Sequence, residues 1–271
     1  MPKIQFPFEV KEDEEGVNRR DPNEQDELFR SLPEDLQAAC QEHRHLWDYL
    51  CLLPFDEVTV PEYYTELTRS LGDRKEHNLI YTVGEGIFVH LCSGSGGGRA
   101  TYIAIEPGLT EDLSNVLPLI EDKLVDETYD LGKARSEEEK ADAFIKLVEK
   151  ICIERGNYAG SIPSGRRKDN VKKGKSKDKK NRVQVTAGQL KALKHIIVRD
   201  KVGMGIIDPM IRDSYIEDIS CSGVGPIFLE HKVFKGIKTA TVFESHDDLD
   251  NFVLNLSESI KKPVTLRRPI V

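Results

Sequence analysis

The last seventy residues, 202–271, are divided by glycine and proline into short segments, and this division most constrains the fold. Gly203, Gly205 and Pro209 interrupt the chain ahead of a short helix expected at 210–213. Glycine and proline destabilise the interior of helices and strands, so they mark the places where regular elements begin and end. Only short elements fit between such breaks.

Strands and one helix are expected in the segments that follow. The strands are predicted at 217–221, 227–231, 233–237 and 240–243, with a glycine-rich turn at 222–226. Ser245 opens the helix, and Asp248 three residues later is typical of a capping box. Apolar residues repeat at helical spacing as far as Ile260, and Pro263 closes the helix. The region therefore predicts a small sheet followed by a helix.

The chain ahead of this region predicts a second small unit of the same class. Strands are expected at 79–83, 86–92 and 100–106. Helices are expected from Ser31 through a stripe that ends at Leu50, and at 113–125, 136–155 and 187–200. Ser136 and the three glutamates after it suit the positive end of a helix. The fold class predicted for the whole chain is α+β.

Charge is distributed unevenly along the 271 residues. The net charge is -8, but residues 166–182 hold ten basic residues against Asp169 and Asp178, so this run carries +8 and the remainder carries -16. Four parts follow from these patterns. They are an acidic flexible N-terminal tail at 1–30, an α+β domain at 31–160, a Lys/Arg-rich linker at 161–185 and a sheet domain at 186–271 that is incomplete at its C-terminus.

The basic run at 166–182 has three interpretations. It is a solvated flexible tether, a segment that binds anionic lipid headgroups, or a contact for nucleic acid. Aromatic residues do not alternate with its lysines. Nucleic-acid binding would therefore be nonspecific and sensitive to salt.

The composition favours a soluble cytoplasmic protein, and binding of the basic run to lipid headgroups would place it at the periphery of a membrane. No stretch of the sequence approaches the ~20 apolar residues that span a bilayer, and the first fifteen lack the apolar core of a secretory signal. The five cysteines are scattered without a C-x-x-C pair, so each is expected to be a small core residue rather than a disulfide or zinc ligand.

Three groups of polar residues are assigned no chemistry. The SGSGGGR segment at 93–99 is expected to be a hairpin loop, because no Lys-Ser/Thr pair and no helix follows it. His43 and His45 lie two positions apart, so they are expected on a solvated helix face and not on one metal ion. Acidic residues of the last region are expected at turns and strand edges; they are Asp208, Asp213, Glu217 and Asp218.

Four segments in order carry a resemblance to a known family. They are VGMGIIDPMIRD, IEDISCSGVGPIFLEH, DDLDNFVLNL and VTLRRPIV, all within 202–271. This order resembles the N-terminal sheet domain of the type II and type IV secretion ATPases, the motors of pilus and archaellum assembly, and is most similar to the archaeal branch. A weaker likeness extends to YTVGEGIFVHL and to residues 99–124. The phosphate-binding motif G-x-x-x-x-G-K-[ST] does not occur in the sequence.

The resemblance implies a role as the N-terminal, non-catalytic region of a hexameric motor that uses ATP and Mg²⁺ and pushes on a membrane platform protein. Arg267 and Arg268 occupy the general position from which arginines of this domain approach the nucleotide in the motor domain. A surface pair that balances acidic neighbours is the alternative for them. The chain alone is expected to bind no cofactor and to hydrolyse no ATP. The alternatives for the whole chain are a stand-alone adaptor or regulator of such a machine, and a nonspecific nucleic-acid-binding protein.

Overall fold

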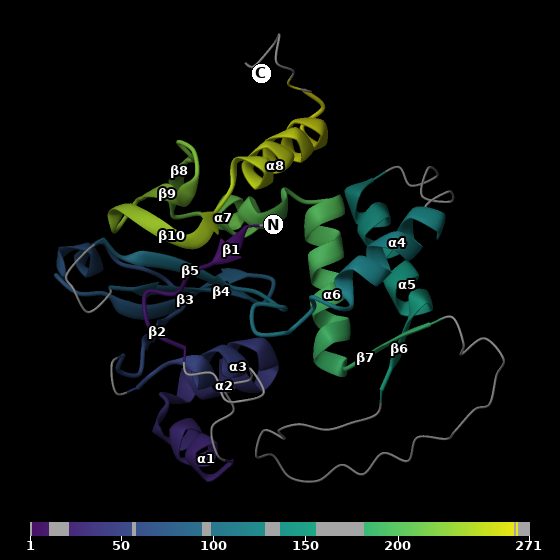
Figure 1. The fold of residues 1–271 in the computed structure, drawn as a ribbon. Coiled ribbons are helices and arrows are strands. Elements are labelled where there is room, and N and C mark those ends of the chain that lie inside the picture. The colour runs from purple at the N-terminus through teal and green to yellow at the C-terminus, as the bar shows by residue number, and fades with distance from the viewer. Residues whose placement is uncertain are drawn as a thin grey trace.

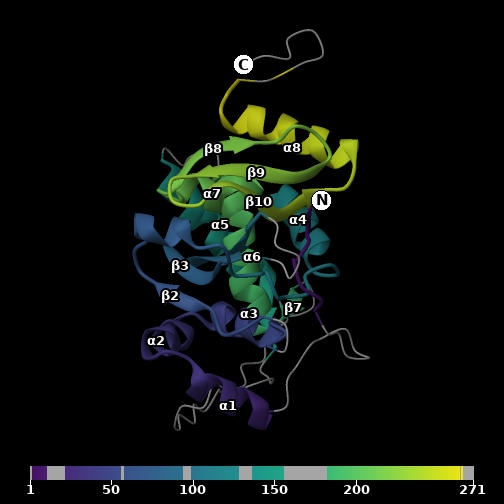
Figure 2. The same cartoon turned by 90° about the vertical axis from the view of Figure 1, so that its left-hand side faces the viewer.

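The computed structural model describes residues 2–10, 22–55, 58–93, 99–127, 136–155, 182–262 and 264. The fold class is α+β, as predicted, and the central element is one mixed sheet of eight strands. Helices α1–α3 lie on one side of this sheet, α8 lies on the other, and α4–α6 stand beside it (Figures 1 and 2).

Seven strands of the sheet follow the order β2-β3-β4-β5-β10-β9-β8, and β1 also pairs with β10. Their bounds are β1 Lys3–Ile4, β2 Glu62–Tyr64, β3 Asn78–Gly84, β4 Ile87–Cys92, β5 Thr101–Ile105, β8 Ile216–Ser220, β9 Gly225–His231 and β10 Lys235–Phe243. Strands from both sides of the basic run therefore belong to one sheet, although the sequence predicts separate domains at 31–160 and 186–271. A second sheet pairs only β6 (Cys152–Glu154) with β7 (Val183–Val185), in parallel.

The helices within the described residues are amphipathic and mostly short. Their bounds are α1 Pro22–Ser31, α2 Glu34–Glu42, α3 Arg44–Leu52, α4 Leu117–Glu127, α5 Glu137–Ile151, α6 Ala187–Lys201, α7 Asp208–Arg212 and α8 His246–Ser259. Short 3-10 helices are Arg69–Asp73 and Gly205–Ile207. Side chains cap three of these helices: Ser136 caps α5, Thr186 forms a full capping box on α6, and Ser245 caps α8.

The join between the two halves of the sheet is narrow. Strands β5 and β10 run parallel, and only two residue pairs hold them in register, Lys238 with Thr101 and Thr239 with Tyr102. Beyond Thr239 the register of β10 against β9 shifts, and β1 pairs with β10 in place of β5. The two strands therefore part just after they meet.

Each face of the sheet has its own apolar core. On one face, α2 and α3 pack Trp47 and Leu50 against strand residues such as Phe88 and Ile103. The core on the other face combines residues from both halves of the chain. They are Leu79, Tyr81, Leu91 and Tyr102 from the first half, and Met210, Ile227, Leu229, Ile237 and Phe243 from the second. The second half of the sheet therefore shares its core with the first.

A third core lies beside the sheet, between α4, α5 and α6. It joins helices from before and after the basic run, and Arg155 donates its backbone N–H to the carbonyl of Val185. Because β6 and β7 pair, residues 155 and 185 lie side by side. The described residues on either side of the segment 156–181 therefore belong to one core and one small sheet, whereas the sequence predicts a linker between two domains.

The expected loose tail at 1–30 is packed where the structure describes it. Strand β1 joins the sheet, and the rings of Phe6 and Phe8 stack at 5.2 Å and pack against the core under α2 and α3. In α1, Leu28 and Phe29 are buried. The segment is mostly acidic, so its few apolar residues do not predict order from sequence. They are enough to hold the segment in place because each packs against a core that other elements form.

Several element boundaries differ from the predictions; α4, expected at 113–125, begins only at Leu117, and three further differences have a clear structural reason. The helix expected at 136–155 ends at Ile151, because the chain leaves it to form β6. The helix expected to start at Ser31 is two helices that meet at His43, whose backbone is not helical. The strands expected at 233–237 and 240–243 are one strand, β10, with its irregularity after Lys238. Local patterns do not reveal these long-range pairings.

Candidate functional site

The residues that the sequence singles out for nucleotide contact, Arg267 and Arg268, lie outside the described residues. Most of the basic run at 166–182 lies outside them too, and only Arg182 is described. The motif segment 202–213 is described in full, as are 216–231 and 247–256. These segments, and the cavity at the sheet join, supply the candidate site.

The segment 203–213 is a compact turn held by one buried carboxylate. Asp208 is 6% exposed; its Oδ1 accepts the backbone N–H of Met204 at 3.2 Å and its Oδ2 accepts from the guanidinium of Arg212. A Cβ on Gly203 would lie 2.7 Å from that Oδ1 and 2.9 Å from the carbonyl oxygen of Arg199. Glycine is required at 203 because the carboxylate approaches the backbone so closely.

The same segment is fastened to the first half of the sheet. Arg212 forms a second ion pair with Glu85, in the turn between β3 and β4. Asp213, 3% exposed, accepts hydrogen bonds from the hydroxyl of Tyr81 at 2.5 Å and from that of Tyr102 at 3.2 Å. Asp213 thus ties α7 to β3 and β5. Asp208 and Asp213 were expected at turns and strand edges, but both are buried and neither faces solvent. The partners of Asp208 lie within its own segment, whereas those of Asp213 come from β3 and β5.

His231 completes this buried polar cluster. Its Nδ1 accepts the backbone N–H groups of Val233 and Phe234 at 3.0 and 3.2 Å, so its Nε2 carries the proton and points toward the Tyr81 hydroxyl, 3.4 Å away. Burial lowers the pKa of His231 to about 4. The ring of Tyr215 stacks on it with centroids 5.7 Å apart. The imidazole is therefore neutral at physiological pH.

Burial also raises the pKa of Asp213 and raises that of Tyr81 well above its usual value. The hydroxyls of Tyr81 and Tyr102 therefore remain protonated and donate to the carboxylate. Each polar group of the cluster has a hydrogen-bond partner within it, and none lines the cavity described below. The cluster therefore connects distant parts of the fold through buried hydrogen bonds.

A second buried carboxylate anchors α6 to the end of β5. Glu106, 8% exposed, lies 2.7 Å from Nε2 of His195 and 2.9 Å from Nη1 of Arg199. Burial opposes ionisation of Glu106, but His195 and Arg199 outweigh it, so the pKa of Glu106 is lowered. Arg199 also reaches Asp200 at 2.8 Å. This ionic cluster connects the helical module to the sheet.

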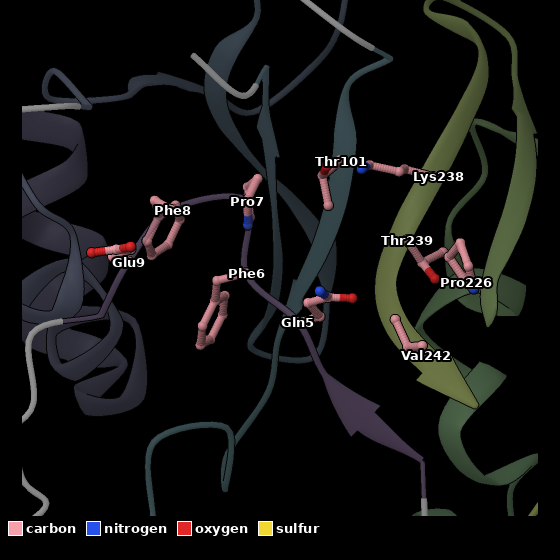
Figure 3. A pocket seen from close by; sticks show the side chains of 10 residues that line it. All are labelled: Gln5, Phe6, Pro7, Phe8, Glu9, Thr101, Pro226, Lys238, Thr239 and Val242. Atoms are coloured by element: carbon pink, nitrogen blue, oxygen red, sulfur yellow. The ribbon is translucent and has the colours of Figure 1, made fainter. Parts of the chain in front are cut away.

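The join between β5 and β10 borders a cavity of about 650 Å³ (Figure 3). The N-terminal segment 5–9 forms one wall, and residues of β5, β9 and β10 form the other. These are Thr101, Pro226, Lys238, Thr239 and Val242. The cavity exists because β5 and β10 part after two residue pairs and β1 fills only the far end of the gap.

Two polar groups in this cavity differ in how they are satisfied. The hydroxyl of Thr239 donates to the carbonyl of Thr241 at 2.9 Å. The hydroxyl of Thr101 is buried and has no hydrogen-bond partner within the described part of the chain, although the residue is 2% exposed. Lys238 is exposed, and Figure 3 shows its side chain extending toward Thr101. The Thr101 hydroxyl is thus a donor without a partner that neighbouring atoms shield from the cavity.

The polar groups that the sequence assigns no chemistry are placed as follows. His45 is buried, not solvated, and its Nε2 lies 2.7 Å from the carbonyl oxygen of Gly86, because the helix breaks at His43 and turns this ring inward. Four cysteines are buried as expected, but Cys221 is exposed in the turn after β8. Ser93 and Arg99 flank a loop between two paired strands, in agreement with a hairpin, while 94–98 lie outside the described residues. Among the residues that the structure describes, no group of three or more His, Cys, Asp or Glu side chains is arranged to hold a metal ion.

Sequence reasoning did not find Thr101, Lys238 or the Asp213 cluster. The tyrosines that bind Asp213 lie more than a hundred positions away, so no local spacing signals them. Asp213 alone had a usable signal, because it ends a segment singled out by its resemblance to a family. Thr101 had none, since a threonine at the start of a strand is ordinary.

Two uncharacterized proteins of Methanocaldococcus jannaschii are similar to this chain. MJ0900 is 26% identical over 238 residues, which cover 88% of this chain and 42% of MJ0900. MJ1288 is 37% identical over 78 residues, which cover 28% of this chain and 31% of MJ1288. No family model matches the chain. Among the described helices, none combines the length and apolarity that a bilayer crossing requires. The matched regions cover less than half the length of each relative.

Proposed function

We propose that this chain is the N-terminal, non-catalytic region of an archaeal-type secretion ATPase that drives the assembly of a pilus, an archaellum or a secretion channel. The observation that carries the proposal is the order of the four motif segments within 202–271. ATP and Mg²⁺ would bind in a motor domain, and this region would move against that domain as nucleotide binds. The machine would be a hexamer at the cytoplasmic face of the membrane.

The roles of the motif residues support a mechanical function for this region. In the segment 203–213, Arg212 binds Glu85, Asp213 binds Tyr81, and Asp208 holds Arg212 in place. None of these residues lines the cavity at the β5–β10 join. A region that transmits motion needs such internal connections more than it needs a catalytic group.

The surface of α8 supports a partner on that side. Leu249, Phe252 and Leu256 pack against the sheet, while Val253 and Leu254 are 41% and 47% exposed. In the sequence, this helix precedes Arg267 and Arg268. The matched region covers 42% of MJ0900, which leaves room in that relative for a further domain such as a motor.

The proposal is tested by phosphate release. We expect the purified chain alone to release no phosphate above a blank, and the native assembly that contains it to hydrolyse ATP. Replacement of both Arg267 and Arg268 with alanine should lower kcat of that assembly at least ~10³-fold, the lower range for arginines that stabilise phosphoryl transfer. A matched control replaces Lys261 and Lys262 with alanine and should leave kcat unchanged.

Two results would count against the proposal. ATP hydrolysis by residues 1–271 alone would place a motor where the sequence has no phosphate loop. Equal kcat values for the arginine and lysine variants would show that the arginine pair does not act on the nucleotide. The pair would then be a surface pair that balances acidic neighbours.

A further inference from the structure

We propose that the C-terminal segment 265–271 folds back along α8 and covers the exposed face of that helix. In this arrangement Leu266 packs on apolar residues of the face, and Arg268 pairs with Asp250. The inference does not depend on the motor function proposed above. It rests on three features of the described residues: the reversal of the chain after α8, the contact that Val264 makes, and an exposed stripe that is apolar and then acidic.

The chain reverses its direction where α8 ends. Lys261 has a φ of 57°, a left-handed conformation of the kind that commonly follows a helix. Its N–H donates to the carbonyl of Glu258, and the N–H of Lys262 donates to the carbonyl of Ser257, both at 2.9 Å. These two hydrogen bonds form a Schellman motif, which brings the chain after the helix against its last turns. The segment that follows therefore starts beside α8 and not in line with its axis.

Val264 continues this reversal. Its N–H donates to the Oγ of Ser257 at 3.4 Å, seven positions back in the sequence. Ser257 is 4% exposed, whereas Val253 and Leu254, one turn closer to the start of α8, are 41% and 47% exposed. The helix face is therefore covered at the level of Val264 and open beyond it.

The open part of the face belongs to one stripe of α8. Residues three and four positions apart lie on the same side of a helix. The residues of the stripe have this spacing; they are Asp250, Val253, Leu254 and Ser257. From its serine toward the start of the helix, the stripe is apolar and then acidic. The chain after position 264 has the complementary order, with Leu266 first and Arg268 second.

Distances along the helix support this pairing. A helix rises about 1.5 Å per residue, so the two apolar residues lie roughly 5–6 Å and Asp250 about 10 Å from the level of Ser257. An extended chain advances about 3.3 Å per residue, which carries Leu266 about 7 Å and Arg268 about 13 Å from Val264. The leucine thus reaches the apolar pair, and the long arginine side chain spans the remaining distance to the carboxylate.

The alternation of side chains separates the two arginines of the segment. In an extended chain successive side chains point to opposite sides, so Leu266 and Arg268 share the side of Val264. Arg267 points away from α8. Asp250 is exposed and forms no ion pair within the described part of the chain, so its carboxylate is open to Arg268. Only one of the two arginines therefore contacts the helix.

The chain's own segment fits this face better than a separate molecule does. The residues that follow Val264 are held within a few positions of the stripe, which gives them a local concentration on the order of 1 mM there. A second copy of the chain would bring the same charges without this tether. A partner that binds this face of α8 must therefore displace the segment first.

The test is disulfide trapping in the full chain. Cys221→Ser removes the exposed cysteine, and Leu254→Cys with Leu266→Cys then places one thiol on the stripe and one on the segment. Asn255→Cys with Leu266→Cys is the matched control, because Asn255 is exposed at the next position but projects from another side of α8. A disulfide requires Cβ atoms about 4 Å apart, so we expect the first pair to form at least about 10-fold faster in a glutathione buffer.

Charge variants of the trapped pair test the assignment of the arginine. Arg268→Gln removes the partner of Asp250 and should slow trapping about 2-fold or more, which corresponds to an exposed ion pair. Arg267→Gln changes the net charge equally and should leave the rate unchanged. In the chain without engineered cysteines, methyl NMR should show an NOE between Leu266 and Leu254.

The proposal is overturned if the two cysteine pairs form at equal rates, or if Arg267→Gln slows trapping as much as Arg268→Gln does. Absence of the NOE also overturns it. A disulfide-linked dimer on non-reducing electrophoresis, in place of a 30.7 kDa monomer, would assign the face to a second copy and contradict the proposal. None of these measurements uses nucleotide, so their failure leaves the motor proposal untouched.

Discussion

The two halves of the central sheet are stabilised in different ways. Strands β3 to β5 have helices α2 and α3 on one face, and all six residues of β4 are buried. Strands β8 to β10 have no comparable helical layer, and α8 covers them with a half-exposed stripe. The second half depends on a core that it shares with the first and on the Asp213 cluster. The half that carries the family resemblance is therefore the half that does not complete its own core.

The largest expected effect comes from the core of the first half. Trp47 is 2% exposed and packs edge-on against Phe29 with ring centroids 5.3 Å apart. Trp47→Ala should lower the free energy of unfolding, measured by urea titration, by about 3–5 kcal/mol. Leu254→Ala on α8, where the side chain is 47% exposed, should cost no more than about 0.5 kcal/mol. Similar losses for the two variants would contradict the difference between the halves.

The second effect concerns the contact between the halves. Asp213→Ala removes the acceptor of two buried tyrosine hydroxyls, so we expect a loss of about 2–3 kcal/mol in the free energy of unfolding. Asp218→Ala on the exposed edge strand β8 is the matched control and should change stability by less than about 0.5 kcal/mol. If both variants were equally stable, the cluster would not hold the halves together.

The third effect is a dependence of stability on pH in both halves. Burial lowers the pKa of His90 to about 3 and that of His231 to about 4, below the ordinary value of 6.5. The unfolded chain therefore binds these protons first, and the stability of the fold is lost as pH falls from 6.5 toward 4. Each histidine contributes up to about 1.4 kcal/mol per pH unit. Urea midpoints measured across this range report the slope.

Histidine variants assign that slope to each half. His90→Asn removes one titrating group, so it should reduce the slope of the unfolding free energy against pH by the contribution of one proton. His231→Asn should do the same. His246, which is exposed at the start of α8, is the control, and His246→Asn should leave the slope as it is. An unchanged slope in His90→Asn would mean that this imidazole is protonated in the folded state, contrary to its burial beside Tyr49 and Asn78.

The smallest effect lies in the partly exposed ion pairs of α7. Arg212→Gln breaks the contacts with Asp208 and Glu85, but the arginine side chain is 41% exposed, so solvent screens them. We expect a loss of about 1 kcal/mol in the free energy of unfolding. Lys232→Gln, at an exposed turn lysine, should cost less than half as much. A larger loss for the lysine variant would show that the ion pairs do not stabilise the segment.

The sequence predicts the local elements of this fold better than their arrangement. Strands β3, β4 and β5 and the caps at Ser136 and Ser245 follow from periodicity and residue type. The joining of β5 to β10 does not follow, because it depends on a two-pair contact between segments about 137 positions apart by residue number. The pairing of β6 with β7 across the basic run is hidden for the same reason.

The candidate site was less predictable than the fold. Arg267 and Arg268 were singled out by resemblance and stay a prediction. Thr101 and Lys238 are neighbours because of the strand register, which no local pattern reports. The lack of a partner for the Thr101 hydroxyl is likewise visible only in the folded chain. A single sequence records residue types and spacings, and neither reports which buried donors lack acceptors.

The composition of the native assembly tests the central claim most directly. The chain, tagged in cells that produce it, would be purified and analysed by native mass spectrometry and peptide sequencing. The account predicts a hexamer whose peptides include a G-x-x-x-x-G-K-[ST] motif, in the same polypeptide or in a partner at fixed ratio. Recovery of the 30.7 kDa chain without any such ATPase would contradict it.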